Sequence, residues 1–295
     1  MDGELAYQSW GPVQPDQMVL LLHDFTDSHR ATGDGFCDGW GKQLVGPVLT
    51  PHSGWVVSMN LLGSPFGSTS SSMVPSGPDG RPGLELSVED LARAAAAGAR
   101  MLGAKRVRAV VGIGLGGLVA LKMLSLFDGL CDGVVAIGAG LALPLGAREL
   151  LGLTRQFVQA GSFRKARGDF LLWTHRREHL LKQCGGREGM EKWLHEQAGA
   201  FTQNYNPQAY VSLAQTYCNA DLKGTFGKVS AKVLLVAGSH DELAPPARVR
   251  DAYHELESAG AQCRLRELVE ERGHAYLLSE SGRLVDLFGE FFGSL

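Results

Sequence analysis

The sequence predicts an α/β protein with a mainly parallel sheet flanked by helices and one inserted helical segment. Short apolar stretches of strand type alternate with helical patterns along the chain, as such a sheet requires. The 295 residues, 44% of them hydrophobic, suffice to bury one sizeable core. One long segment has helical patterns and no strand. The expected strands lie near 18–23, 55–59, 107–112, 133–138, 232–237 and 263–269.

The expected elements also place the boundaries of the chain's parts. Residues 1–142 and 228–295 form the expected core, and residues 143–227 form a helical lid inserted into it. Ser87 to Asp90 resemble a capping box and predict a helix start ahead of Leu91. Residues 68–82, rich in Ser, Gly and Pro, predict a long ordered loop or a mobile flap, which composition does not separate.

A glycine-rich turn joins the third expected strand to the next helix, within Val110 to Leu118. Gly112, Gly114 and Gly117 fit the spacing of a dinucleotide-binding turn, where a pyrophosphate approaches a helix N-terminus. The same strand, turn and helix also fit a nucleophile elbow, Gly-x-Ser-x-Gly, with Gly114 in the place of the serine.

The surrounding chain favours the elbow. A dinucleotide fold places an acid about 20 residues after its turn, at the end of the next strand. Here that strand ends in Gly138 to Gly140, without an acid. Asp241 follows one late strand and His274 follows the next, which is the order nucleophile, acid, base of α/β-hydrolases. We therefore expect an α/β-hydrolase fold that lacks the nucleophile.

From about Ala6 to the C-terminal helix, the chain resembles the homoserine O-acetyltransferases. Besides the elbow, the acid loop and Gly273–His274, the resemblance includes five short motifs and two expected lid segments. These are Gly39–Trp40, Leu44–Pro47, Asn60–Gly63, Gly67–Thr69 and Arg81–Gly83, with Trp193–Gln197 and Phe201–Tyr210 in the lid.

The resemblance implies an acetyl group carried from acetyl-CoA on the elbow serine, and Gly114 has no atom that can form that ester. It also implies substrate contacts at Asn60, at Glu196 in place of a lid tyrosine, and at Arg187, which matches a lid arginine across an extra glycine. The usual aspartate after the catalytic histidine is Ala275 here. Homoserine is therefore a poor candidate for the ligand.

Other parts of the family's machinery need no serine. The resemblance implies an oxyanion hole made by the backbone amides of Leu115 and Phe25. An acid on one imidazole nitrogen fixes the tautomer, so Asp241 is expected to orient His274 as an acid or base. His23 and Asp24 are expected to be loop and capping residues.

Three functions remain open from the sequence. The first is non-covalent acid/base chemistry by His274 and Asp241 on a small carbonyl or acyl compound, with the Phe25 and Leu115 amides holding its oxygen. The second is a catalytically silent homologue that binds a ligand or serves as a partner subunit. The third is an acyltransferase or hydrolase whose serine was exchanged for Gly114 by engineering.

Composition narrows the partners. A formal net charge of −3, without a basic stripe, disfavours nucleic acid. Basic clusters at 164–167 and 175–179 are expected on a solvated face of the lid. Five dispersed cysteines without C-x-x-C spacing predict reduced thiols in the cytoplasm and no metal centre, and no cofactor is expected.

The sequence also bears on membranes and assembly. The acidic N-terminus lacks the regions of a signal peptide, and no apolar run approaches the ~18 residues of a membrane span. A homodimer through the lid helices is expected, because family members tend to pair there. The apolar residues offered for this contact are Trp173, Leu180, Leu181, Trp193, Leu194 and Phe201.

Overall fold

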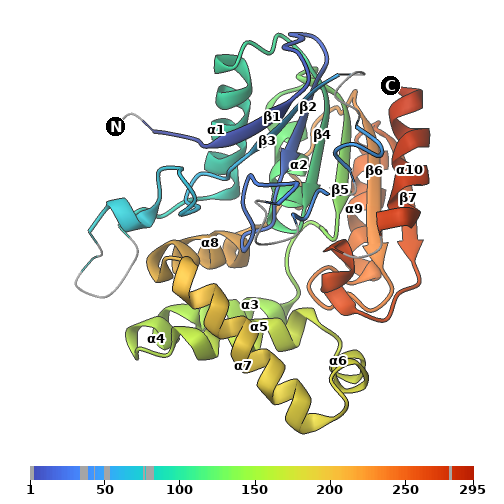
Figure 1. The fold of residues 1–295 in the computed structure, drawn as a ribbon. Coiled ribbons are helices and arrows are strands. Elements are labelled where there is room, and N and C mark those ends of the chain that lie inside the picture. Colours follow the sequence, from blue (N-terminus) through green and yellow to red (C-terminus); the bar gives the residue numbers. More distant parts are fainter. Residues whose placement is uncertain are drawn as a thin grey trace.

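A computed structural model describes residues 3–33, 39–42, 44–49, 54–75, 77, 83–278 and 281–295. Its centre is a seven-stranded sheet of order β1-β3-β2-β4-β5-β6-β7, in which only β1 is antiparallel to its neighbour (Figure 1). The strands are β1 Tyr7–Trp10, β2 Met18–Leu22, β3 Trp55–Met59, β4 Val107–Ile113, β5 Cys131–Ile137, β6 Lys232–Gly238 and β7 Gln262–Leu268.

The six strands expected from apolar runs are present as β2 to β7. The sequence analysis missed β1, a four-residue edge strand whose side chains are exposed or half-buried. Such a strand pairs through its backbone and contributes little to the core, so it leaves no apolar run to detect.

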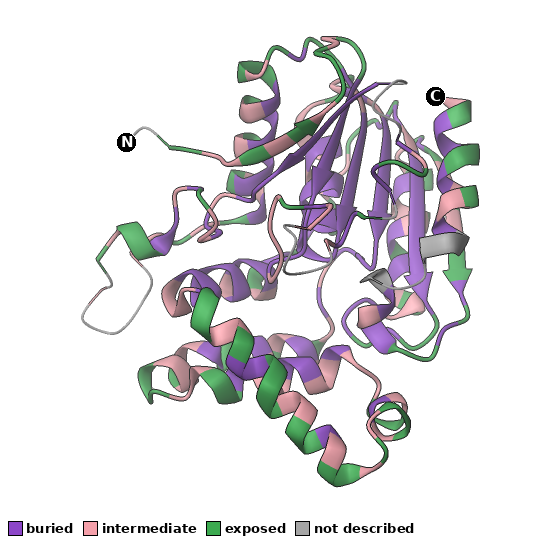
Figure 2. Ribbon diagram, viewed as in Figure 1, coloured by how far each residue is buried: buried purple, intermediate pink, exposed green. Residues whose placement is uncertain are grey.

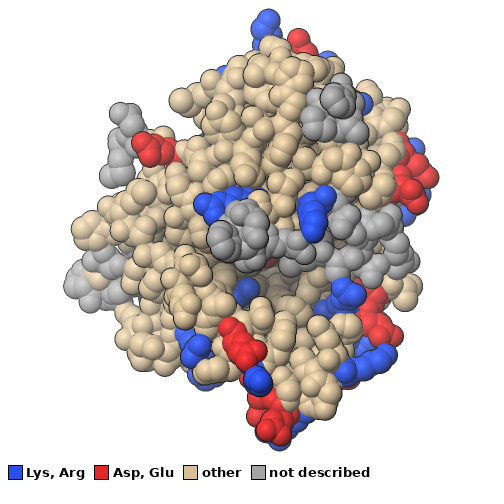
Figure 3. Space-filling model, in the orientation of Figure 1, with Lys and Arg blue, Asp and Glu red and all other residues tan. Residues whose placement is uncertain are grey.

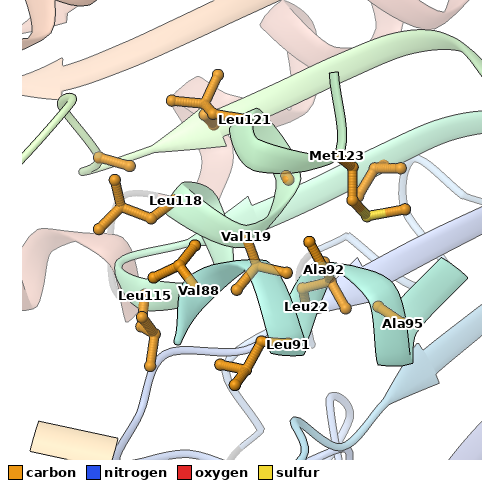
Figure 4. Close-up of a cluster of buried hydrophobic side chains, with 14 of the residues drawn as sticks. Leu22, Val88, Leu91, Ala92, Ala95, Leu115, Leu118, Val119, Leu121 and Met123 are labelled. Carbon is orange, nitrogen blue, oxygen red and sulfur yellow. The ribbon is translucent and has the colours of Figure 1, made fainter. Parts of the chain in front are cut away.

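Alternate side chains of each central strand enter two separate cores. In β2, Leu20 and Leu22 pack on one face of the sheet, and Val19 and Leu21 pack on the other. Residues of helices α1 (Val88–Met101), α2 (Leu115–Leu126) and α9 (Pro246–Ser258) join the first core. Figure 4 shows α1 and α2 meeting through aliphatic side chains of this core. Helix α10 (Ser281–Ser294) covers the other face.

The capping box expected at Ser87 is confirmed. The Ser87 hydroxyl accepts from the Asp90 backbone amide, and the Asp90 carboxylate accepts from the Ser87 amide. Both bonds satisfy amides that a helix start leaves free, so α1 begins at Val88.

Six helices lie between β5 and β6 and form a layer across one end of the sheet (Figure 1). They are α3 Leu145–Gly152, α4 Thr154–Gln159, α5 Phe163–Thr174, α6 Arg177–Gln183, α7 Arg187–Asn204 and α8 Pro207–Asn219. Figure 2 shows α8 largely buried and much of α7 exposed. No strand interrupts residues 143–227, all of which the structure describes.

The apolar lid residues offered for a dimer contact lie largely inside the subunit. Leu180 is fully buried, and the other five, among them Trp173 and Phe201, are half-buried. Trp173 and Phe201 pack against the core. Dimerisation through these side chains stays a prediction, and their burial gives it no support.

The glycines of the turn after β4 let helix α2 cross the sheet closely. A Cβ at Gly112 would lie 2.1 Å from the carbonyl oxygen of Gly116, and a Cβ at Gly116 would lie 2.3 Å from that of Leu22. Glycine is therefore required here for packing alone, and the spacing needs no nucleotide to explain it.

Candidate active site

Gly114 sits between β4 and α2 with φ 52° and ψ −119°, a conformation that side-chain-bearing residues adopt at a cost. Its N–H donates to the carbonyl of Ile137, which fixes the turn at the carboxyl end of the sheet. These angles and this position are those expected for the strand-to-helix turn of a nucleophile elbow, and here the turn has no side chain at its apex.

The carboxylate of Asp24, from the loop after β2, occupies the space beside Gly114. A Cβ built on Gly114 would lie 2.2 Å from Asp24 Oδ1. The Leu115 N–H donates to the same oxygen at 2.8 Å, and the Phe25 N–H also donates to this carboxylate. The two amides expected to form an oxyanion hole for substrate therefore hold a carboxylate of the protein itself. This agrees with the expectation that Asp24 is a loop or capping residue, because its carboxylate accepts from the first N–H of helix α2.

His274 lies in the short helix η2 (Gly273–Leu278) that follows β7, and Asp241 lies in the loop after β6. The His274 Nδ1–H donates to Asp241 Oδ2 at 2.7 Å. The other oxygen of Asp241 accepts from the amides of Leu243 and Ala244 at 2.9 and 2.8 Å. Asp241 is thus held on both oxygens and fixes the orientation of the His274 ring.

The remaining nitrogen of His274 is buried and makes no hydrogen bond within the described residues. It lies 4.0 Å from Asp24 Oδ2. Burial lowers the pKa of His274, but the carboxylates of Asp241, Asp24 and Asp27 outweigh it and raise the pKa overall. The protonated ring, with its Nε2–H directed toward Asp24, is the form that this site favours.

The charges of Asp24 and Asp27 both act on this imidazole. Burial raises the pKa of Asp24, although His274 and the Leu115 and Phe25 amides oppose the rise. Burial and the charge of Asp24 raise the pKa of Asp27 to about 7. Arg167 on α5 lowers the pKa of both groups.

The raised pKa of Asp27 makes stability depend on pH. Its folded value of about 7 lies above the unfolded value near 4, so the contribution of Asp27 to stability is fully present below pH 4 and is lost as pH rises to about 7. Asp27→Asn removes this ionisation and is expected to be more stable than wild type at pH 8 by roughly 1–3 kcal/mol, allowing for partial solvent screening. Thermal melts of wild type and Asp27→Asn at pH 5 and pH 8 measure how the stability difference between the two proteins changes with pH. Asp16→Asn, at an exposed site, is the control, and a difference for Asp27→Asn that does not grow with pH contradicts the assignment.

Helix α5 places Arg167 inside the lid rather than on the solvated face expected for its basic cluster. Its Cζ lies 4.2 Å from the ring centre of Phe201 and 5.6 Å from that of Phe170. Arg167 Nε and Nη1 are buried and make no hydrogen bond within the part of the chain that the structure describes. The Tyr205 hydroxyl donates to the carbonyl of Phe25 at 2.6 Å and ties the lid to the Asp24 loop.

Two clefts approach the site between the lid and the sheet. One of about 850 Å³ is lined in part by Trp173, Pro245 and Asp241. A second of about 650 Å³ is lined in part by Lys182 and Arg272 and reaches Ala275. His175 borders both, and burial lowers its pKa to about 4, so it stands between them as a neutral ring.

Residues 19–287 match the model of the alpha/beta hydrolase family. The chain belongs to the alpha/beta hydrolase family. A serine O-succinyltransferase of Litchfieldella anticariensis is 26% identical over 97% of this chain and 92% of that relative. A homoserine O-acetyltransferase of Deinococcus radiodurans is 29% identical over 99% and 87%. The solved structure of a homoserine O-acetyltransferase from Staphylococcus aureus superposes with a TM-score of 0.84, at 21% identity over 97% and 88% of the two chains.

The resemblance to the acetyltransferases thus extends along nearly the whole chain, and the fold is the α/β-hydrolase fold. The carboxyl ends of the strands bring together Gly114, Leu115, Phe25, Asp241 and His274, as the chain order of this family led us to expect. The three residues expected to contact substrate lie elsewhere.

Asn60 supports loops and is not free for substrate. Its Nδ2 donates to Ser68 Oγ at 3.0 Å and to the Phe66 carbonyl at 3.3 Å, and its Oδ1 accepts from the His29 amide at 3.3 Å. His23 lies beside Asn60, and its ring is bonded to the Asp24 carbonyl and the Leu61 amide. Burial lowers the pKa of His23 to about 4, so this ring is neutral and structural.

Arg187 and Glu196 lie on exposed positions of α7. Arg187 pairs with Glu191 at 2.7 Å, and Glu196 lies 4.0 Å from Lys192. All four side chains are more than half exposed to solvent. On the face seen in Figure 3, charges of both signs are intermixed over the lid. The contacts of Arg187 and Glu196 with substrate stay a prediction, and their exposed positions give it no support.

The sequence analysis missed the roles of Asp24, Asp27 and Arg167. The segment His23 to Asp27 could have indicated the two acids, because it places them directly after a buried strand. Ligands bind at the carboxyl ends of the strands in such sheets. For Arg167, the signal was its position three residues before Phe170 on the buried stripe of an amphipathic helix.

Among the described residues, no group of three or more His, Cys, Asp or Glu side chains is arranged to hold a metal ion. Among the helices of the same residues, none combines the length and apolar character that crossing a bilayer needs.

Proposed function

We propose that this protein is an enzyme of non-covalent acid/base chemistry on a small carbonyl or acyl compound, with His274 as the central group and Asp241 as its orienting partner. The observation that carries the proposal is the state of His274. Its Nδ1 is bonded to Asp241 at 2.7 Å, and its Nε2 is buried, without a hydrogen-bond partner among the described residues. An oriented imidazole with one free nitrogen in a closed site is suited to proton transfer.

The same geometry argues against a covalent acyl route at the elbow. Gly114 has no nucleophilic atom, and the Asp24 carboxylate fills the space and the amides that an acyl intermediate would use. In the proposed reaction, the Nε2–H of His274 therefore polarises the substrate oxygen, and the Phe25 and Leu115 amides do not.

Anionic substrates suit the surroundings of the site. Lys182 and Arg272 line the cleft that reaches Ala275, beside His274. Arg167 adds a cation under the lid, whose buried Nε and Nη1 groups have no hydrogen-bond partner among the residues that the structure describes. A substrate carrying a carboxylate or similar anion would satisfy such groups.

A catalytically silent homologue is the second candidate function. It is favoured because Asp24 already binds the amides expected to form the oxyanion hole. Asp24 satisfies the Leu115 amide at 2.8 Å, so the hole has no vacant donor at that position. Engineering of one serine to glycine fits less well, because a serine Cβ at position 114 and the present Asp24 carboxylate overlap.

Proton exchange tests the proposal directly. Wild-type protein in D₂O is expected to catalyse exchange of the acidic C–H protons of a panel of small 1,3-dicarbonyl compounds and acyl thioesters, followed by proton NMR. His274→Ala is expected to lower the exchange rate at least ~100-fold and Asp241→Asn at least ~10-fold, because each removes or misorients the acid/base group.

The melting temperature of each variant checks that the fold is kept. Exchange that persists in both folded variants would show that His274 is not the acid/base group. An absence of exchange in wild type, combined with thermal stabilisation of all three proteins by one of the compounds, would favour the silent binding protein.

A further inference from the structure

Asp24 is held in a fixed orientation by one of its two oxygens. Oδ1 accepts from the Leu115 N–H at 2.8 Å, at the N-terminus of α2, where a helix favours negative charge. Oδ2 is directed toward His274 and lies 4.0 Å from Nε2. Asp24 is 6% exposed and His274 is 4% exposed. One oxygen of this carboxylate is thus anchored, and the other faces the acid/base group of the proposed enzyme.

The two groups have complementary proton chemistry. Burial raises the pKa of Asp24, which makes its carboxylate a stronger base than an exposed aspartate. The neighbouring carboxylates raise the pKa of His274 and favour its imidazolium form. A base and an acid therefore lie side by side, 4.0 Å apart in the free protein, so a carbon acid placed against this pair would contact both groups.

The other carboxylates near His274 are less suited to this task. Asp241 uses both oxygens, one for two backbone amides and one for His274. Asp27 is half-buried, and no hydrogen bond or ion pair directs it at Nε2. The titratable groups whose charges act on or with Asp24 are Asp27, His274, Arg167, Tyr205, Tyr210, Tyr217.

We propose that Asp24 is the catalytic base that removes a proton from a carbon acid, while His274 donates its Nε2 proton to the neighbouring substrate oxygen. This rests on the proposed acid/base function and names its reaction class. The electrons of the C–H bond form a C=C bond, the π electrons of the C=O bond move onto the oxygen, and that oxygen gains the His274 proton. Asp24 ends as the neutral acid and His274 as the neutral imidazole.

The geometry also gives a way to restore the starting state. Once product leaves, the proton on Asp24 Oδ2 and the unprotonated Nε2 face each other, 4.0 Å apart in the free protein. A small approach of the two groups returns the proton to His274. Catalysis then needs no external cofactor and no covalent intermediate.

The ring opening of 5-nitrobenzisoxazole tests Asp24 without knowledge of the natural substrate. A base removes the ring C–H proton, the N–O bond breaks to give a nitrile, and the oxygen becomes a coloured phenolate that can accept a proton. Asp24→Asn keeps an oxygen for the Leu115 amide but loses the basic carboxylate. We expect it to lower the protein-catalysed rate at pH 7 at least 100-fold, with a melting temperature within about 3 °C of wild type.

Asp16→Asn is the control, because it removes an exposed carboxylate that precedes β2, whereas Asp24 follows that strand, and its rate should stay within threefold of wild type. The wild-type rate should fall as pH is lowered through the raised pKa of Asp24, and Asp16→Asn should keep this decline. Ring opening by wild type no faster than by heat-denatured protein, or a folded Asp24→Asn variant with more than a third of the wild-type rate, would overturn the assignment.

The two proposals fail in different ways. If Asp24→Asn keeps both ring opening and C–H exchange while His274→Ala loses exchange, His274 acts without Asp24 and only the present inference is wrong. If His274→Ala and Asp241→Asn also keep exchange, the proposed function itself is wrong.

Discussion

Gly114→Ser alone is expected to give no measurable esterase activity, whereas Gly114→Ser combined with Asp24→Ala is expected to hydrolyse p-nitrophenyl acetate. In the single variant, the new Cβ would lie 2.2 Å from Asp24 Oδ1, and the Leu115 amide would still be occupied by that carboxylate. Removing the Asp24 carboxylate clears the space for the serine and frees the amides for a substrate oxygen.

The double variant would also have a histidine to act on the new serine. His274 is oriented by Asp241 at 2.7 Å, and removing Asp24 takes away one of the carboxylates that favour its protonated form, so that Nε2 can accept the serine proton. Because a single oxyanion donor contributes about 10²–10³ in rate, the double variant should exceed Gly114→Ser by at least ~100-fold in hydrolysis and show an acetyl mass increment.

Two controls isolate the triad. Asp24→Ala alone has no nucleophile and should stay inactive, and adding His274→Ala to the double variant should abolish the gain. Equal activity of Gly114→Ser with and without Asp24→Ala would mean that Asp24 does not occupy the position of the serine side chain.

The fold and the histidine–aspartate pair were accessible from sequence because each depends on local pattern and chain order. Apolar runs located β2 to β7, and residues that follow successive parallel strands meet at one edge of the sheet. Asp241 and His274 could therefore be paired before any contact was known. Edge strand β1 escaped because it carries no buried run.

The role of Asp24 could not be predicted because it depends on which way a loop side chain turns. The sequence shows an acid after β2, but not that its carboxylate reaches the N–H of Leu115, 91 residues away. The space that it fills exists only because position 114 has no side chain. Two separate residues thus define one site, and neither reveals it alone.

The direction of the Arg187 and Glu196 side chains could not be predicted from the sequence for a geometric reason. Successive residues on a helix point about 100° apart, so one extra glycine in an alignment moves a side chain from the site face to the solvent face. Arg187 begins α7 directly after Gly185 and Gly186, and it pairs with Glu191 in solvent. Arg167 on α5 supplies a cation under the lid instead.

Gly116→Ala is expected to cause a large loss of stability. The added Cβ would lie 2.3 Å from the carbonyl oxygen of Leu22 and 2.5 Å from that of His23. Both are backbone atoms at the end of a central strand, so relief requires α2 to move away from the sheet. Overpacking against a rigid core costs about 3 kcal/mol or more, which for a domain of this size lowers the melting temperature by roughly 6–12 °C.

Gly168→Ala in α5 is the matched control, because a Cβ there has no neighbour within 4 Å. With no contact to disturb, alanine should be neutral or stabilise the helix by up to ~1 kcal/mol. Thermal melts of both variants and of wild type measure these changes in stability. If Gly116→Ala melts within 2 °C of wild type, the close crossing of α2 over β2 is not the reason for glycine at this position, and the glycine pattern of the turn must be explained by what binds there.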